Sequence, residues 1–162
     1  MLEKGGNAFD ASVAAGFALQ VVEPHLNGPA GEVPILIAKA GSRSVKVICG
    51  QGPAPAAATI ERYVGLGLDM VPGNGLLSAT LPGSFDAWML LLKEYGTMEL
   101  AEVLGPAIGM AKNGYPLVPT ICRTIATVRD LFVNDWPTSA AIYCPGGKVP
   151  EPGSLFSNKP LA

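Results

Sequence analysis

Near its beginning the sequence reads Leu2-Glu-Lys-Gly-Gly-Asn-Ala-Phe-Asp-Ala-Ser-Val-Ala-Ala15, and no other stretch says as much about the fold. Asn7 is a favoured N-cap residue, and Asp10 places a carboxylate in the first turn, where the helix dipole stabilises negative charge. From position 8 to position 22, apolar residues recur at spacings of three and four, the period of an α-helix. Pro24 disfavours helical geometry at the residue before it. The stretch therefore predicts a helix that begins at Ala8 and ends near Val22.

The helix is followed by a loop and then by two strand-like runs. Ile35–Lys39 and Ser44–Cys49 are rich in β-branched residues, and Ala40-Gly-Ser-Arg43 joins them, which predicts a β-hairpin. The first run is continuously apolar, so we expect both faces of this strand to be covered.

The sequence pattern predicts five further elements. They are a short helix over residues 60–65, a short strand over Leu76–Thr80, a helix over Phe85–Tyr95 that Ser84 caps, a helix that Thr97 caps and that runs to Asn113 with a kink or break at Pro106, and a helix from Pro119 to about Val133. The tail after Trp136 is rich in proline and glycine. A helix, a hairpin and a helical block in this order indicate an α+β fold with a mixed or antiparallel sheet.

Composition limits the classes of protein to consider. Hydrophobic residues make up 49% of the 162 residues and charged residues 15%, with a mean hydropathy of +0.34. The chain has either a highly buried core or apolar surface that belongs against a missing partner. A net charge of −2 gives no electrostatic reason to expect a nucleic-acid partner. No apolar run approaches the ~18 residues that a membrane span needs. No signal peptide is visible, which favours a cytoplasmic location.

The cysteines and glycine pairs do not form a recognisable cofactor motif. Cys49, Cys122 and Cys144 are far apart in sequence and form no CxxC or Cys/His cluster, so we expect no zinc site. Reduced, partly buried thiols are the favoured interpretation, against a catalytic or bridged role. Gly65-Leu-Gly67 and Gly73-Asn-Gly75 lack the Lys-Ser/Thr or helix-opening context of a phosphate-binding loop.

His25 is the only histidine, so a Ser-His-Asp or Cys-His arrangement would have to use it. It follows the predicted end of the first helix, where an imidazole can satisfy terminal carbonyl groups. We favour this structural role over that of a general base. None of the threonines lies in a convincing self-cleavage setting, and Thr97 and Thr120 are better interpreted as residues that start helices.

Several further motifs occur in a fixed order along the chain. They are GGNA-x-DA-x-VA at positions 5–14, Val22-Glu-Pro-His25, Gly28-Pro-Ala-Gly31, Val47-Ile-Cys-Gly-Gln-Gly-Pro-Ala-Pro55, Leu81-Pro-Gly83, Glu94-Tyr-Gly-Thr97, Pro106-Ala-Ile108 and Ala111-Lys-Asn-Gly-Tyr-Pro116. Their order and spacing resemble the N-terminal part of the large subunit of γ-glutamyltranspeptidases, which are N-terminal-nucleophile hydrolases. The resemblance implies part of a four-layer αββα sandwich, incomplete in this chain, with residues 1–162 forming a single partial domain.

The resemblance also implies a mechanism. In this family a precursor cuts itself, and the new N-terminal threonine of the small subunit attacks an amide carbonyl with its own α-amino group as base. An acyl-enzyme forms, and water or an amine takes the acyl group. We therefore expect no catalytic residue in this chain. The expected partner is a small subunit or missing C-terminal half that carries the threonine, and this favours the interpretation that partner surface is exposed.

Gln51 is the candidate substrate-binding residue. In the family, the arginine of a DGRETAP element binds the α-carboxylate of the γ-glutamyl group, because two parallel N–H donors meet two oxygens. Gln51 stands at that position, and its neighbours Cys49, Gly52 and Pro53 also depart from the pattern. Glutamine donates hydrogen bonds without carrying charge, so an acylase-like activity on another amide fits better. Alternatively, Gln51 is a loop residue that binds no ligand.

Two functions from different classes remain open at this point. The chain is a segment of an amidohydrolase or acyltransferase that acts on a small-molecule amide or γ-glutamyl substrate, or it is a truncated or degenerate relative that acts only in assembly. Neither function implies a metal ion or another cofactor.

Overall fold

The computed structural model describes residues Met1 to Ala162, which divide into two compact units. The first unit contains Met1–Gly28 and Leu92–Ala162, and the second contains Pro29–Leu91. The expectation that residues 1–162 form a single partial domain stays a prediction.

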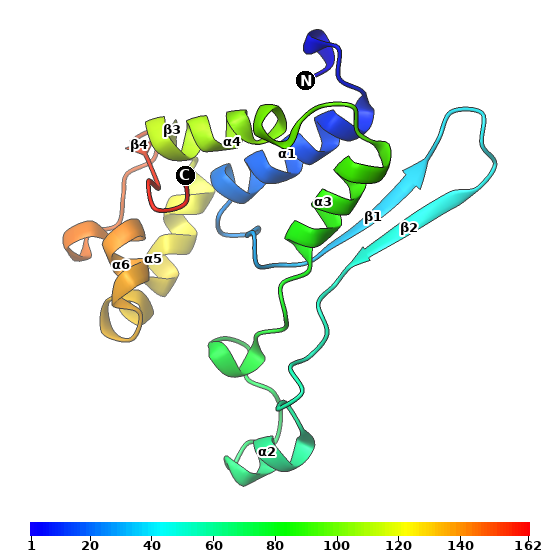
Figure 1. Ribbon diagram of the computed structural model, residues 1–162. Coiled ribbons are helices and arrows are strands. Elements are labelled where there is room, and N and C mark those ends of the chain that lie inside the picture. Colours follow the sequence, from blue (N-terminus) through cyan, green and yellow to red (C-terminus); the bar gives the residue numbers. More distant parts are fainter. The chain divides into compact units, whose positions relative to one another are not determined.

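The first unit is mainly helical (Figure 1). Its elements are η1 (Leu2–Lys4), α1 (Ala8–Val22), α4 (Leu100–Asn113), β3 (Tyr115–Pro116), α5 (Pro119–Asn134), α6 (Pro137–Tyr143), η3 (Pro145–Gly147) and β4 (Leu155–Phe156). The predicted bounds of α1 are confirmed. Asn7 caps α1, because its side-chain oxygen accepts hydrogen bonds from the backbone N–H groups of Phe9 and Asp10 at 2.8 and 3.1 Å.

α1 packs lengthwise against α4 (Figure 1), and both helices carry small residues that are buried. Val13 of α1 and Val103 of α4 are 0% exposed, and Ala107 and Ala111 continue the buried stripe of α4. Small side chains let two helix backbones approach closely, so this pair forms the main core of the unit.

The start of α4 differs from the prediction. The N-cap residue is Glu99 rather than Thr97, and the Glu99 N–H donates to Glu102 Oε2 at 3.3 Å. Thr97 lies before the helix, where its backbone N–H and its hydroxyl both donate to Asp10. α4 also continues from Leu100 to Asn113 with Pro106 inside it, so of the two predicted outcomes, a kink or a break, the break does not occur.

The tail after Trp136 contains structure that the proline and glycine content did not predict. β3 pairs with β4 in antiparallel register, Tyr115 opposite Phe156. Aromatic rings hold these parts together: ring centroids lie 5.9 Å apart for Tyr115 and Phe156, 5.6 Å for Tyr143 and Phe156, and 5.9 Å for Phe132 and Tyr143. Offset and edge contacts between aromatic rings stabilise such a cluster beyond simple burial.

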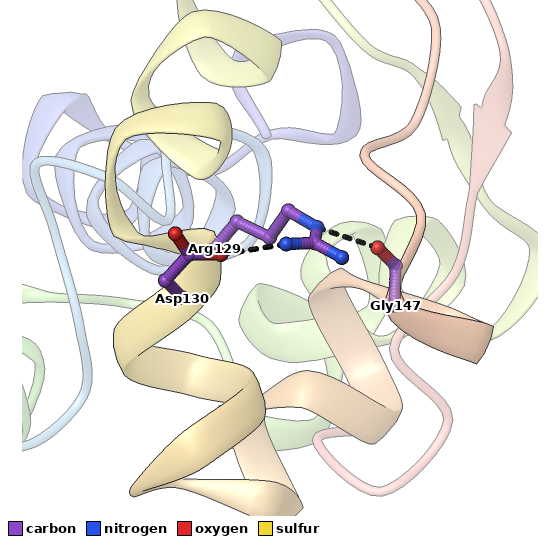
Figure 2. Close-up of polar contacts among 3 residues, drawn as sticks. All are labelled: Arg129, Asp130 and Gly147. Carbon is purple, nitrogen blue, oxygen red and sulfur yellow. Dashed lines mark hydrogen bonds and ion pairs between the residues drawn. The ribbon is translucent and has the colours of Figure 1, made fainter.

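A hydrogen bond from Arg129 of α5 holds the turn after α6 in place. Figure 2 shows its guanidinium between two oxygens: Nε donates to the carbonyl oxygen of Gly147 at 2.6 Å, and an Nη atom contacts Asp130 Oδ1 at 2.6 Å. Asp130 is 82% exposed, so water screens this ion pair. The bond to Gly147 is the contact that links two separate elements.

The second unit consists of β1 (Val33–Ala38), β2 (Val45–Gly50), α2 (Ile60–Gly65), η2 (Leu76–Ser78) and most of α3 (Ser84–Tyr95) (Figure 1). The predicted hairpin and the predicted helix over residues 60–65 are confirmed. β1 and β2 are antiparallel, with Leu36 opposite Val47 and Ile37 opposite Lys46. Thr59 caps α2, because its hydroxyl accepts from the Arg62 N–H at 3.2 Å.

Within the second unit only one of the two faces of the hairpin is covered, which differs from the expectation for β1. Ile37 is 3% exposed, whereas Leu36, Val45 and Val47 on the opposite face are 73, 59 and 64% exposed. A strand buried on both faces needs a layer on each side. No other element of the second unit covers this face of the hairpin.

The predicted strand over Leu76–Thr80 is also wrong. Residues Leu76–Ser78 form a 3-10 turn, and the Ser78 hydroxyl donates to the carbonyl oxygen of Gly75 at 2.9 Å. The apolar run at 76–80 pairs with neither free edge of the two-stranded sheet in this unit. No helix in either unit combines the length and apolar character that crossing a membrane requires.

Candidate functional site

Gln51 lies where two backbone segments of the second unit cross. It follows the end of β2 at Gly50, and Gly52 packs directly against the backbone of Leu81. The Leu81 N–H donates to the Pro53 carbonyl at 3.0 Å, which ties the two segments together. Two sequence motifs some 30 positions apart thus meet at the candidate residue.

Glycine is required at this crossing. A Cβ atom added at Gly52 would collide with the carbonyl group of Leu81, and one added at Gly83 would collide with the carbonyl oxygen of Gly50. Both obstacles are backbone, which cannot rotate away as a flexible side chain can. The backbone on both sides of Gln51 is therefore held in place by close packing.

A third motif joins the same junction. The backbone N–H groups of Gly83 and Ser84 both donate to the Gly31 carbonyl, at 3.2 and 3.0 Å. The Ser84 hydroxyl, 2% exposed, donates to the Pro29 carbonyl at 3.1 Å. Ser84 was expected to cap α3; it begins that helix and also anchors the Pro29–Gly31 loop.

The side chain of Gln51 is exposed and has one close partner. The Cys49 thiol, also exposed, donates to Gln51 Oε1 with 3.7 Å between sulfur and oxygen. Val45, Val47 and Cys49 are every second residue of β2, so their side chains share one face of the strand. The Cys49 thiol therefore lies on the uncovered face of the hairpin. Gln51 thus stands at the end of an exposed apolar surface.

His25 lies in the first unit and does not play the predicted role. The Leu19 carbonyl at the end of α1 accepts from the Glu23 N–H at 2.8 Å, so the chain itself satisfies it. The His25 side chain is 7% exposed, and Nδ1 lies 3.5 Å from Glu23 Oε2 without a hydrogen bond. The imidazole lines a cavity of about 70 Å³ whose other walls are mostly apolar: Pro24, Ile121, Thr124, Ile125, Val128, Phe132 and Tyr143.

The most strongly bonded carboxylate is Asp10, and it is structural. It is 0% exposed and accepts hydrogen bonds from the N–H groups of Asn7, Thr97 and Met98 and from the Thr97 hydroxyl, at 2.7 to 3.1 Å. Burial acts to raise the pKa of Asp10, but these bonds outweigh it and lower the pKa to about 2. Asp10 therefore stays ionised and joins α1 to the segment before α4.

The three cysteines are free thiols, as the sequence indicated. Cys122 and Cys144 are buried and Cys49 is exposed. Burial raises the pKa of Cys144, although the Arg129 guanidinium acts in the opposite direction. No group of three or more His, Cys, Asp or Glu side chains is placed to hold a metal ion. Thr120 accepts a hydrogen bond from Arg123 within the first turn of α5, as expected of a residue at a helix start.

Comparison with known sequences shows what the chain is similar to. The sequence model of the γ-glutamyltranspeptidase family matches residues 1–162. The glutathione hydrolase-like YwrD proenzyme of Bacillus subtilis (strain 168) is 40% identical over 100% of this chain and 30% of its own length. The acylase ACY 1 proenzyme of Pseudomonas sp. (strain SE83) is 38% identical over 94% of this chain and 29% of its own length. The chain thus spans about a third of these relatives.

Solved structures agree with these sequence similarities. A structure of an LmbA2991 variant is 60% identical and has a TM-score of 0.94, covering 98% of this chain and 27% of that one. The γ-glutamyltranspeptidase of Helicobacter pylori is 32% identical with a TM-score of 0.89, over 99% of this chain and 46% of that one. The α+β fold, as an incomplete part of an N-terminal-nucleophile hydrolase fold, is confirmed.

Proposed function

The chain belongs to the γ-glutamyltranspeptidase family, where it corresponds to the N-terminal part of the large subunit, and on this basis we propose that it forms one wall of the substrate pocket of an amidohydrolase or acyltransferase. The convergence of Pro29–Gly31, Gly50–Pro53 and Leu81–Ser84 around Gln51 carries this proposal. Tight backbone packing gives one exposed polar side chain a defined position, as substrate recognition requires.

The proposed nucleophile is a threonine outside residues 1–162. Its hydroxyl oxygen attacks the amide carbonyl carbon, and its own α-amino group takes the hydroxyl proton. The C–N bond then breaks, and the leaving amine takes that proton. Water or another amine attacks the resulting ester and restores the threonine.

The uncovered apolar face of the hairpin is an argument that another part of the protein packs against this chain. Leu36, Val45 and Val47 expose apolar surface that water would otherwise contact. We propose that the part of the protein that carries the threonine covers this face. Because Gln51 stands at the end of the same face, the covering segment would lie beside it.

The presence of glutamine at position 51 favours a substrate whose acyl group is not γ-glutamyl. A neutral amide cannot offset the desolvation of a carboxylate as a guanidinium does. The similarity to an acylase proenzyme points in the same direction. We propose that the substrate is an amide whose acyl group does not depend on an α-carboxylate for binding.

Mass and sequence of the purified protein test this function. We would isolate the full-length protein without denaturation and measure intact mass and N-terminal sequences. A second chain that begins with threonine supports a processed hydrolase, and matched amides with and without an α-carboxylate then define the acyl group. An uncut protein that hydrolyses no amide overturns the proposal in favour of a non-catalytic assembly subunit.

A further inference from the structure

The contact between Cys49 and Gln51 determines which end of the glutamine amide is free. The Cys49 thiol donates to Gln51 Oε1, with sulfur and oxygen 3.7 Å apart. A glutamine side chain has one acceptor oxygen and two N–H donors on Nε2. The thiol occupies one lone pair of this oxygen, and both N–H donors remain available to a ligand.

The backbone supports this orientation. Gly50 and Gly52 flank Gln51 and pack against Ala87 and Leu81, respectively, too closely for a Cβ atom. Cys49 is held in the β2 ladder opposite Pro34. Both ends of the Cys49–Gln51 contact therefore start from backbone of limited freedom, and the S–H···O bond acts on side chains whose Cα positions are held.

We propose that Cys49 is a positioning residue that directs the Gln51 N–H donors toward the acyl group, so that the site selects acyl groups with a neutral hydrogen-bond acceptor. This inference rests on the proposed function of Gln51 in the substrate pocket. A carbonyl, ether or hydroxyl oxygen suits a neutral donor, because such an oxygen costs less to desolvate than a carboxylate. An acyl group that carries a methylene instead of this oxygen leaves the Gln51 N–H donors without an acceptor.

Matched substrates and matched variants of the full-length protein test the inference. The two substrates are p-nitroanilides whose acyl groups differ only in a carbonyl oxygen or a methylene at the distal end. We expect the unmodified protein to prefer the carbonyl substrate and Gln51→Leu to lose the preference. Cys49→Ala is expected to reduce the preference about threefold, through KM rather than kcat, as loss of one weak hydrogen bond implies.

Cys49→Ser is the matched control, because a hydroxyl donates to the same oxygen. It should keep the preference that Cys49→Ala reduces, which a merely structural role of Cys49 would not produce. An unchanged preference in Cys49→Ala overturns the inference while leaving the proposed function intact.

A second readout does not depend on activity. The side-chain amide signal of Gln51, observed by NMR with glutamine ¹⁵N labelling, should move in Cys49→Ala and move less in Cys49→Ser. A full-length protein that hydrolyses no amide overturns the proposed function, and the NMR comparison then decides whether the contact exists. The same Gln51 signal in the unmodified protein and in Cys49→Ala overturns the inference directly.

Discussion

The Thr97 hydroxyl donates to Asp10 Oδ2 at 2.8 Å, although 87 positions of sequence separate the two residues. Asp10 also accepts from the backbone N–H of Asn7, which belongs to the cap of α1. One carboxylate therefore stabilises the start of α1 and fixes the segment that leads to α4. Gly96 contributes because a Cβ atom there would crowd Asp10 Oδ1, at 2.7 Å.

Replacement of Asp10 by asparagine should destabilise the protein. An amide has one acceptor oxygen and cannot serve the four donors that the carboxylate accepts. Leaving buried donors unsatisfied costs about 1–3 kcal/mol each, so we expect a loss of roughly 2–4 kcal/mol in the free energy of unfolding. Urea denaturation measures it. Thr97→Ser keeps the hydroxyl and is the control; equal stability of Asp10→Asn and the unmodified protein would contradict the assignment.

The same carboxylate predicts a pH dependence of stability. The pKa of Asp10 is about 2 in the folded protein and 3.8 in the reference state, so the folded state favours the ionised form. At about 1.4 kcal/mol per pH unit, this difference stabilises the protein by about 2–3 kcal/mol above pH 5. The contribution declines as the pH falls from about 4 to about 2. Unfolding curves of the unmodified protein and Asp10→Asn should therefore converge over this pH range.

Gly52→Ala should disrupt the crossing beside Gln51. The added methyl group meets the Leu81 carbonyl, and neither backbone can yield cheaply. We expect a loss of about 2 kcal/mol or more in stability, a cost typical of overpacking. Gly65→Ala is the matched control, since nothing lies within 4 Å of a Cβ atom there. Thermal unfolding of both variants checks the prediction, and equal effects would refute it.

Arg129→Ala should loosen the turn after α6. The variant removes the 2.6 Å bond from Nε to the Gly147 carbonyl, and we expect hydrogen exchange around residues 144–148 to accelerate about tenfold, which is the effect of losing roughly 1.4 kcal/mol. Asp130→Ala removes only the exposed ion pair and should change exchange little. Similar exchange in the two variants would show that Gly147 is not held by Arg129.

Leu36→Lys should leave the folding of this unit unchanged and weaken its association with the threonine-bearing part. Leu36 is 73% exposed, so the substitution should change the stability of this part of the protein by no more than about 0.5 kcal/mol. A buried lysine would be costly if another segment covers this face. We therefore expect normal helix content by circular dichroism but reduced association with the threonine-bearing part in co-purification. Normal association would place the covering segment elsewhere.

Elements that depend on short-range signals were predictable from the sequence. Asn7 and Pro24 bound α1, Thr59 caps α2, and alternating residues around a short connection form the hairpin. The resemblance also located Gln51 as the candidate residue. The sequence prediction was wrong at Thr97 and at the apolar run 76–80. Thr97 binds Asp10, which is distant in sequence, and the run at 76–80 pairs with no strand.

The sequence by itself determined the bounds of α1, the hairpin and the family. Caps and periodicity act over a few residues, and the order of the motifs can be read directly from the sequence. Only the tertiary structure decided what Asp10 binds, where the aromatic residues of the tail gather and why Gly52 and Gly83 must lack side chains. These features depend on packing between segments tens of residues apart. Their energies come from burial and from hydrogen bonds that form only once those segments meet.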